Sequence, residues 1–217
     1  MTVHLQRDLD SLKKDIVHLG SLVQNSTQSV FEFLGTKSEQ QLQDVLEYED
    51  RINELEVDIE EHCLKVLALH QPVAIDLRFI IVIMKVNNDL ERMGDQAVNI
   101  SHRIKSLMDG PELPISLPID EMTNAVQKMV SLSLEALVSQ DPAIARKVVD
   151  MDDIVDDLNA QTYDLIRETI QANPSLVNSA MSMATISSNL ERIGDLCTNI
   201  AEEVIFMVEG QVIRHQN

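Results

Sequence analysis

Two acidic residues one helical turn apart occur twice in this chain, inside a stretch that is itself repeated. Residues 89–100 read DLERMGDQAVNI, and residues 189–200 read NLERIGDLCTNI. Glu91 and Asp95 of the first copy therefore recur as Glu191 and Asp195, 100 residues later. Side chains at positions i and i+4 of a helix lie on one face, so each copy presents a pair of carboxylates. Such a pair indicates either a cation site or an acidic face in water.

The glycine between the two acids favours a role beyond a solvated face. Glycine inside a helix costs about 1 kcal/mol relative to alanine, so Gly94 and Gly194 predict that another backbone packs closely there. The same polar face continues along each copy and adds a second rank of candidate metal ligands: Asn99 and His102 in the first copy, and Asn199 and Glu202 in the second.

A weaker repeat relates the segments that precede the two copies. An offset of 99 residues aligns three apolar positions of each segment: Ile52, Leu55 and Ile59 with Met151, Ile154 and Leu158. In that register four more acids form two further pairs: Glu54 with Asp58, and Asp153 with Asp157. One helix supplies only two adjacent ligands, so we expect these pairs to complete the two sites. An acidic run this dense is also typical of a solvated helix face.

The residue types in these pairs suit metal binding better than catalysis. Carboxylates with a few amide oxygens favour hard or borderline cations such as magnesium, calcium, manganese, iron or zinc. The chain has no Gly-rich phosphate loop, no G-x-S-x-G and no H-E-x-x-H motif. None of its six His residues has Glu three positions before it, which argues against a di-iron bundle oxidase. We predict that the protein is not an enzyme.

Composition and breakers predict an all-α protein of tandem three-helix bundles. The chain has only six Gly and six Pro in 217 residues and is rich in aliphatic residues. The apolar spacing and the capping signals predict six long antiparallel helices: 5–34, 38–69, 72–108, 119–139, 141–172 and 173–210. We therefore divide the chain into a first repeat over 1–109, a linker over 110–118 and a second repeat over 119–217.

The formal charge of −19 restricts the kinds of molecule that the protein could bind. It disfavours nucleic acid and anionic lipid and favours cations or a basic protein. The polar start of the chain and the lack of a long apolar run predict a cytoplasmic protein with no direct membrane insertion. Cys63 and Cys197 lie in apolar helical segments without a C-x-x-C motif, so we expect small core residues in a reducing compartment.

Two long segments resemble the PhoU family of phosphate-uptake regulators. They are QPVAIDLRFIIVIMKVNNDLERMGDQAVNI at 71–100 and SSNLERIGDLCTNIAEEVIFMVEG at 187–210. The resemblance implies a fold of two related three-helix bundles. It also implies multinuclear clusters of iron or another metal on E/D-x-x-x-D motifs, which fall here on Glu91 with Asp95 and on Glu191 with Asp195. Iron or zinc is the first expectation, with manganese or magnesium as alternatives.

The family resemblance also implies partners. PhoU-like proteins couple a Pst-type phosphate ABC transporter to a sensor histidine kinase and damp the phosphate-starvation response. The expected partners are therefore the transporter ATPase, the kinase and a second copy of this chain in a homodimer. An alternative of another class is a metal-independent acidic helical adaptor that regulates a different transporter.

Overall fold

The chain is all-α over residues 3–210, the part that this computed structural model describes. Its elements are α1 (Val3–Thr36), α2 (Glu39–His70), α3 (Ile75–Met108), α4 (Ile119–Ser139), α5 (Pro142–Val149), α6 (Asp152–Ala172), the short 3-10 helix η1 (Pro174–Leu176) and α7 (Val177–Glu209). No strand occurs in these residues, as the composition predicts.

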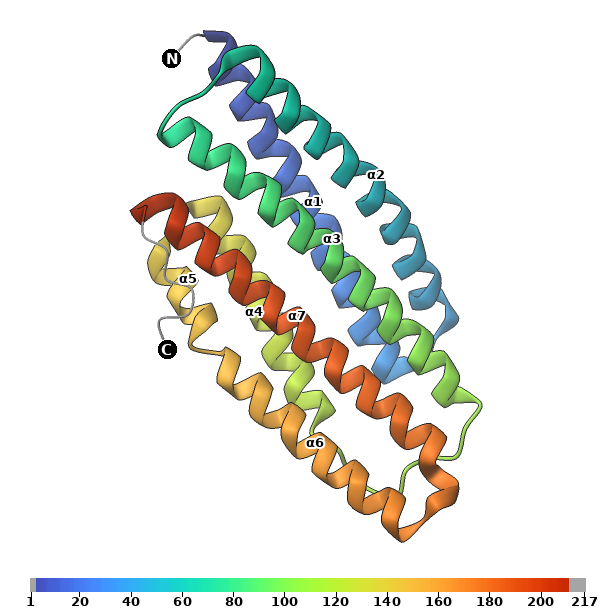
Figure 1. The fold of residues 1–217 in the computed structure, drawn as a ribbon. Coiled ribbons are helices and arrows are strands. Elements are labelled where there is room, and N and C mark those ends of the chain that lie inside the picture. Colours follow the sequence, from blue (N-terminus) through green and yellow to red (C-terminus); the bar gives the residue numbers. More distant parts are fainter. Residues whose placement is uncertain (1–2, 211–217) are drawn as a thin grey trace.

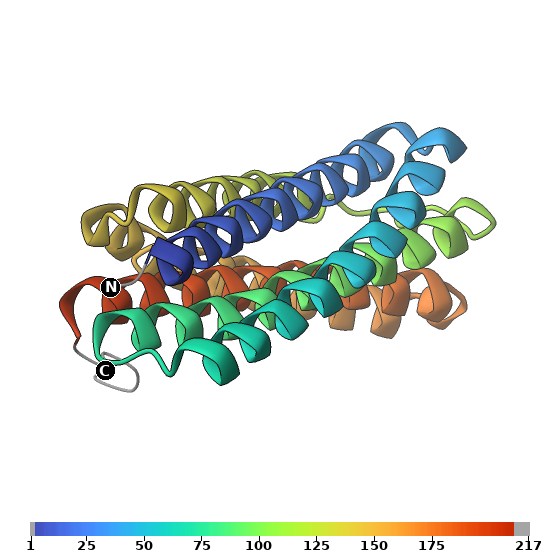
Figure 2. The ribbon, with the colours of Figure 1, turned by 90° about the horizontal axis from the view of Figure 1, so that it is seen from above.

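The helices form the two bundles expected from the internal repeat. Helix α1 packs on α2 and α3, and α4 packs on α5, α6 and α7. The two helices that carry the repeated motif, α3 and α7, run side by side and antiparallel through the middle of the molecule (Figure 1). Helices α1 and α4 both lie on one side of this central pair (Figure 2). The tandem three-helix architecture is confirmed.

Short polar residues and prolines begin several helices where the sequence predicts. The Ser38 hydroxyl accepts a hydrogen bond from the Gln40 N–H at the start of α2. Asp141 accepts one from Ala143 and precedes Pro142, the first residue of α5. Asn173 caps η1 in the same way and leads into α7. Each cap satisfies a backbone donor that has no partner within its helix.

The prediction of a single helix over 141–172 is wrong, because the helix is interrupted at residues 150–151. The N–H of Met151 bonds to the carbonyl of Val148, a tight i to i−3 turn that ends α5. Helix α6 then begins at Asp152, with Asp152 and Asp153 in its first turn. Carboxylates are favourable there because the exposed N–H groups give a helix start a partial positive charge.

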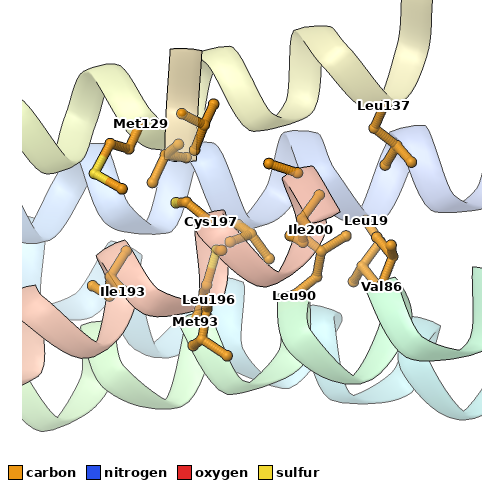
Figure 3. Packing of buried hydrophobic residues seen from close by; sticks show 14 of the residues in the cluster. Leu19, Val86, Leu90, Met93, Met129, Leu137, Ile193, Leu196, Cys197 and Ile200 are labelled. Atoms are coloured by element: carbon orange, nitrogen blue, oxygen red, sulfur yellow. The ribbon is translucent and has the colours of Figure 1, made fainter. Parts of the chain in front are cut away.

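One hydrophobic core joins the two repeats. Figure 3 shows Met93 of α3 beside Leu196 of α7 and Leu90 of α3 beside Ile200 of α7, with Cys197 of α7 in the same cluster, and all five are buried. Cys63 is buried and free as well, so both cysteines are core residues as expected. The repeat boundaries given above remain a prediction; residues 109–118 contain no helix, and residues 1–2 and 211–217 lie outside the described part.

None of the helices within residues 3–210 combines the length and the apolar character that crossing a membrane requires.

Candidate metal centres

The second repeat gathers carboxylates from α6 and α7. Oxygen atoms of Asp156, Glu191 and Asp195 all lie within 4.8 Å of one another. Asp152 lies one turn before Asp156 on α6, and its carboxylate accepts a hydrogen bond of 3.1 Å from the Thr198 hydroxyl. We call Asp152, Asp156, Glu191 and Asp195 the second cluster.

Burial and mutual repulsion disfavour ionisation in the second cluster. Burial raises the pKa of Glu191, and the charges of Asp195 and Asp156 raise it further. Burial likewise raises the pKa of Asp195, with Asp152 and Asp156 as the main repelling neighbours. Burial also raises the pKa of Asp152, although the Thr198 hydrogen bond opposes the shift. A bound cation would relieve this repulsion.

The first repeat brings α2 carboxylates against the matching pair on α3. Glu49 lies against Asp95, and burial together with the Asp95 charge raises the pKa of Glu49 to about 7. Glu56 lies near Glu91, whose pKa is raised by burial and then by Asp95 and Glu56. We call Glu49, Glu56, Glu91 and Asp95 the first cluster.

Gly94 brings α2 close to the first cluster. A Cβ atom at this position would lie 3.1 Å from Glu49 Oε2 and 3.2 Å from the Ile52 side chain. The close packing predicted for the motif glycine is therefore present, although its partners are side chains of α2. At Gly194 the nearest atom, on Val155, would be 3.5 Å away, which is ordinary contact.

The structure does not bring the two pairs predicted on α2 and α6 into the clusters. Glu54, Asp58, Asp153 and Asp157 are exposed, and none of them belongs to the group of described acids whose oxygens lie within 4.8 Å of one another, which is Asp156, Glu191 and Asp195. The buried positions of α2 correspond with those of α5 and α6 at a shift of 103 residues: Val45 with Val148 of α5, and Ile52 and Cys63 with Val155 and Ile166 of α6. The offset of 99 inferred from sequence differs from this by one helical turn, so the apolar stripes still align while different acids are paired.

The second rank of candidate ligands lies along the same two helices. Asn99 and His102 are exposed on α3, and Asn199 and Glu202 are half-buried on α7. Within residues 3–210 the two α3 residues make no hydrogen bond to a cluster carboxylate, and on α7 the Thr198 hydroxyl donates one to Asp152.

The comparisons with known proteins identify the family of this chain. The PhoU domain model matches residues 16–104 and 119–204, one match in each repeat. The chain belongs to the PhoU family. A relative from Aquifex aeolicus, named a phosphate-specific transport system accessory protein PhoU homolog, is 35% identical over 98% of this chain and 96% of its own. A homolog from Thermotoga maritima is 32% identical over 96% of this chain and 90% of its own.

Solved PhoU structures share the whole fold. The crystal structure of PhoU from Pseudomonas aeruginosa superposes with a TM-score of 0.91 at 32% identity, covering 95% of this chain and 99% of that one. The phosphate transport system regulatory protein PhoU from Streptococcus pneumoniae gives a TM-score of 0.86 at 25% identity, covering 96% and 99%. The family suggested by the repeated motif is therefore confirmed.

Both clusters of this PhoU-family chain have the chemistry of a cation site. Every cluster side chain offers carboxylate oxygen, the donor that hard divalent cations prefer. Glu49 Oε2 is buried and accepts no hydrogen bond from the described residues, and the neighbouring group is the like-charged carboxylate of Asp95. Uncompensated buried carboxylates are costly, so the residues present fit a bound metal.

Sequence reasoning missed Glu49, Glu56, Asp152 and Asp156, although a signal for the first two was present. Val45, Ile52, Ile59 and Val66 are buried at intervals of seven on α2. Glu49 and Glu56 fall between them at the other inner position of that heptad pattern. An acid on an apolar seam is a stronger indication of a site than an acid on the dense exposed face.

Proposed function

We propose that this protein is a metal-binding accessory regulator of a phosphate transport system. The observation that carries the proposal is the match of both repeats to the PhoU domain, together with relatives named for that role. In this proposal it acts in the cytoplasm, pairs with a second copy of itself, and represses phosphate uptake and the starvation response when phosphate is plentiful.

The proposed mechanism is docking without chemical turnover. Glu91 and Asp95 with Glu49 on one side, and Glu191 and Asp195 with Asp156 on the other, would hold divalent metal ions, with iron or zinc as the first expectation. A bound ion would supply positive charge that draws the carboxylates of α2 to α3 and those of α6 to α7. The surface so fixed would contact the ATPase of the transporter and a sensor histidine kinase.

The test is complementation of a bacterial strain that lacks its own PhoU protein. Wild-type protein should restore repression of starvation genes at high phosphate, and the quadruple variant Glu91→Ala, Asp95→Ala, Glu191→Ala, Asp195→Ala should not. The matched control is Glu54→Ala with Asp58→Ala, an exposed pair with the same i, i+4 spacing. Full repression by the quadruple variant would refute the metal-dependent mechanism.

The net charge of −19 supports a second candidate, a metal-independent adaptor that contacts a basic partner of a different transporter. Partner binding that survives chelation and weakens steeply with salt would favour this candidate. Binding that is lost on chelation and restored by metal would favour the first.

A further inference from the structure

The two clusters occupy equivalent places in the two repeats but do not offer equivalent ligands. The shift of 103 residues that relates the buried seams of α2 and α6 pairs Glu49 with Asp152 and Asn53 with Asp156. Among residues 3–210, the group of three acidic side chains whose oxygens come within 4.8 Å of one another is Asp156, Glu191 and Asp195. The first repeat has the amide Asn53 at the central α2 position instead.

Asn53 is engaged within the first cluster. Its Nδ2 donates a hydrogen bond of 3.2 Å to Glu49 Oε1. The amide therefore satisfies one oxygen of Glu49 without adding negative charge. Asp156 at the equivalent place adds a carboxylate that repels both Glu191 and Asp195.

The other α2 acid of the first cluster, Glu56, lies two helical turns beyond Glu49. Asn87 Nδ2 donates to both the backbone oxygen of Glu56, at 2.9 Å, and its Oε1, at 3.0 Å. Asn87 is 1% exposed, and its own Oδ1 is buried without a hydrogen bond from the described residues. In the second repeat the position equivalent to Glu56 is the neutral residue Asn159. The Ser187 hydroxyl donates a hydrogen bond of 2.7 Å to it. The first cluster is thus spread over two turns of α2, whereas the second is compact.

The position of each acid relative to the start of its helix adds to the difference between the two clusters. Asp152 lies in the first turn of α6, where the helix start favours negative charge, and Thr198 donates to it. Glu49 lies within α2, far from either end, where no helix start favours its negative charge. The second cluster is therefore prepared for a cation to a degree that the first is not.

We propose that the two clusters bind divalent cations with unequal affinity, the second repeat first, and that the residue at position 53 or 156 sets the difference. This inference rests on the proposed function, since it assumes that both clusters hold metal. Affinity at oxygen-ligand sites follows the number of charged ligands and the rigidity of the site. Cation supply would then vary the occupancy of the first cluster while the second stays filled.

The experiment is a titration of chelator-stripped protein with Mn²⁺, followed by calorimetry and by the electron paramagnetic resonance signal of free Mn²⁺. Wild type should show two classes of site that differ by about tenfold or more. Asp156→Asn should weaken the tight class, and Asn53→Asp should strengthen the weak class. The double exchange of these residues should reverse which repeat fills first. Asp157→Asn is the control, because it removes the same charge from α6 at the neighbouring position, which lies outside the second cluster.

Each result decides the matter. Two equal classes in wild type, or equal effects of Asp156→Asn and Asp157→Asn, would overturn the inference and leave the proposed function intact. No binding of Mn²⁺, Zn²⁺ or Fe²⁺ by any form would overturn both the inference and the metal part of the proposed function. If circular dichroism shows that Asp156→Asn does not fold, the test rests on Asn53→Asp alone. That variant should bind Mn²⁺ more tightly at the weak class of site.

Discussion

Glu49 is the carboxylate whose environment departs most from water in the first cluster. Burial and the neighbouring Asp95 raise its pKa to about 7, while its usual value is near 4.5. The native state therefore binds more protons than the unfolded state between about pH 4.5 and 7. The contribution of Glu49 to the stability of the metal-free protein falls as pH rises through that window and then levels off, because the slope follows the difference in bound protons.

We expect Glu49→Gln to remove the contribution of Glu49 to this pH dependence and to leave the contributions of the other acids whose pKa is raised. A neutral amide keeps the shape of the protonated acid, so the variant should match wild type near pH 5. At pH 8 it should be more stable by about 1–2 kcal/mol, after allowance for the partial exposure of the site. Urea unfolding with chelator present, at pH 5, 6, 7 and 8, measures this, with Glu54→Gln as an exposed control. Parallel pH profiles for wild type and Glu49→Gln would contradict the assignment.

Helix pairing explains which parts of the sites could be read from the sequence. The motif on α3 and α7 recurs without a gap, so the sequence alone places Glu91, Asp95 and their counterparts at matching positions of two helices. The partners on α2 and α6 were not, because a slip of one helical turn preserves an apolar stripe and changes which acids face inward. The break before Asp152 was also hidden, since residues 149–152 contain neither Gly nor Pro.

The two motif glycines give a matched test of how closely α2 and α6 pack on them. Gly194→Ala adds a methyl group at ordinary contact distance and should stabilise the protein by up to about 1 kcal/mol through helix propensity. Gly94→Ala must displace the Glu49 carboxylate or Ile52, so its gain should be smaller or reversed. Thermal unfolding of the two variants compares them directly. Equal stabilisation by both would show that Glu49 does not press against α3.

The whole molecule joins two candidate metal centres through one core. Because α3 and α7 pack against each other along the middle of the protein, each cluster lies on a helix that contacts the other repeat. The repeated motif explains the pairing of the clusters, and Asn53 and Asp156, which differ between the repeats, make their ligand sets unequal. The fold class was predictable from periodicity and breakers, but the shared core required the arrangement of the helices in space.

The most direct test of the central claim, that paired helices in each repeat hold metal, is elemental analysis by mass spectrometry. The protein should be purified without chelator or nickel affinity resin. Wild type should contain stoichiometric iron, zinc or manganese, and Glu191→Ala with Asp195→Ala should lose the share held by the second cluster. The exposed pair Glu54→Ala with Asp58→Ala should keep the full content. Wild-type protein that is metal-free, and stays so when these metals are offered, would contradict the claim.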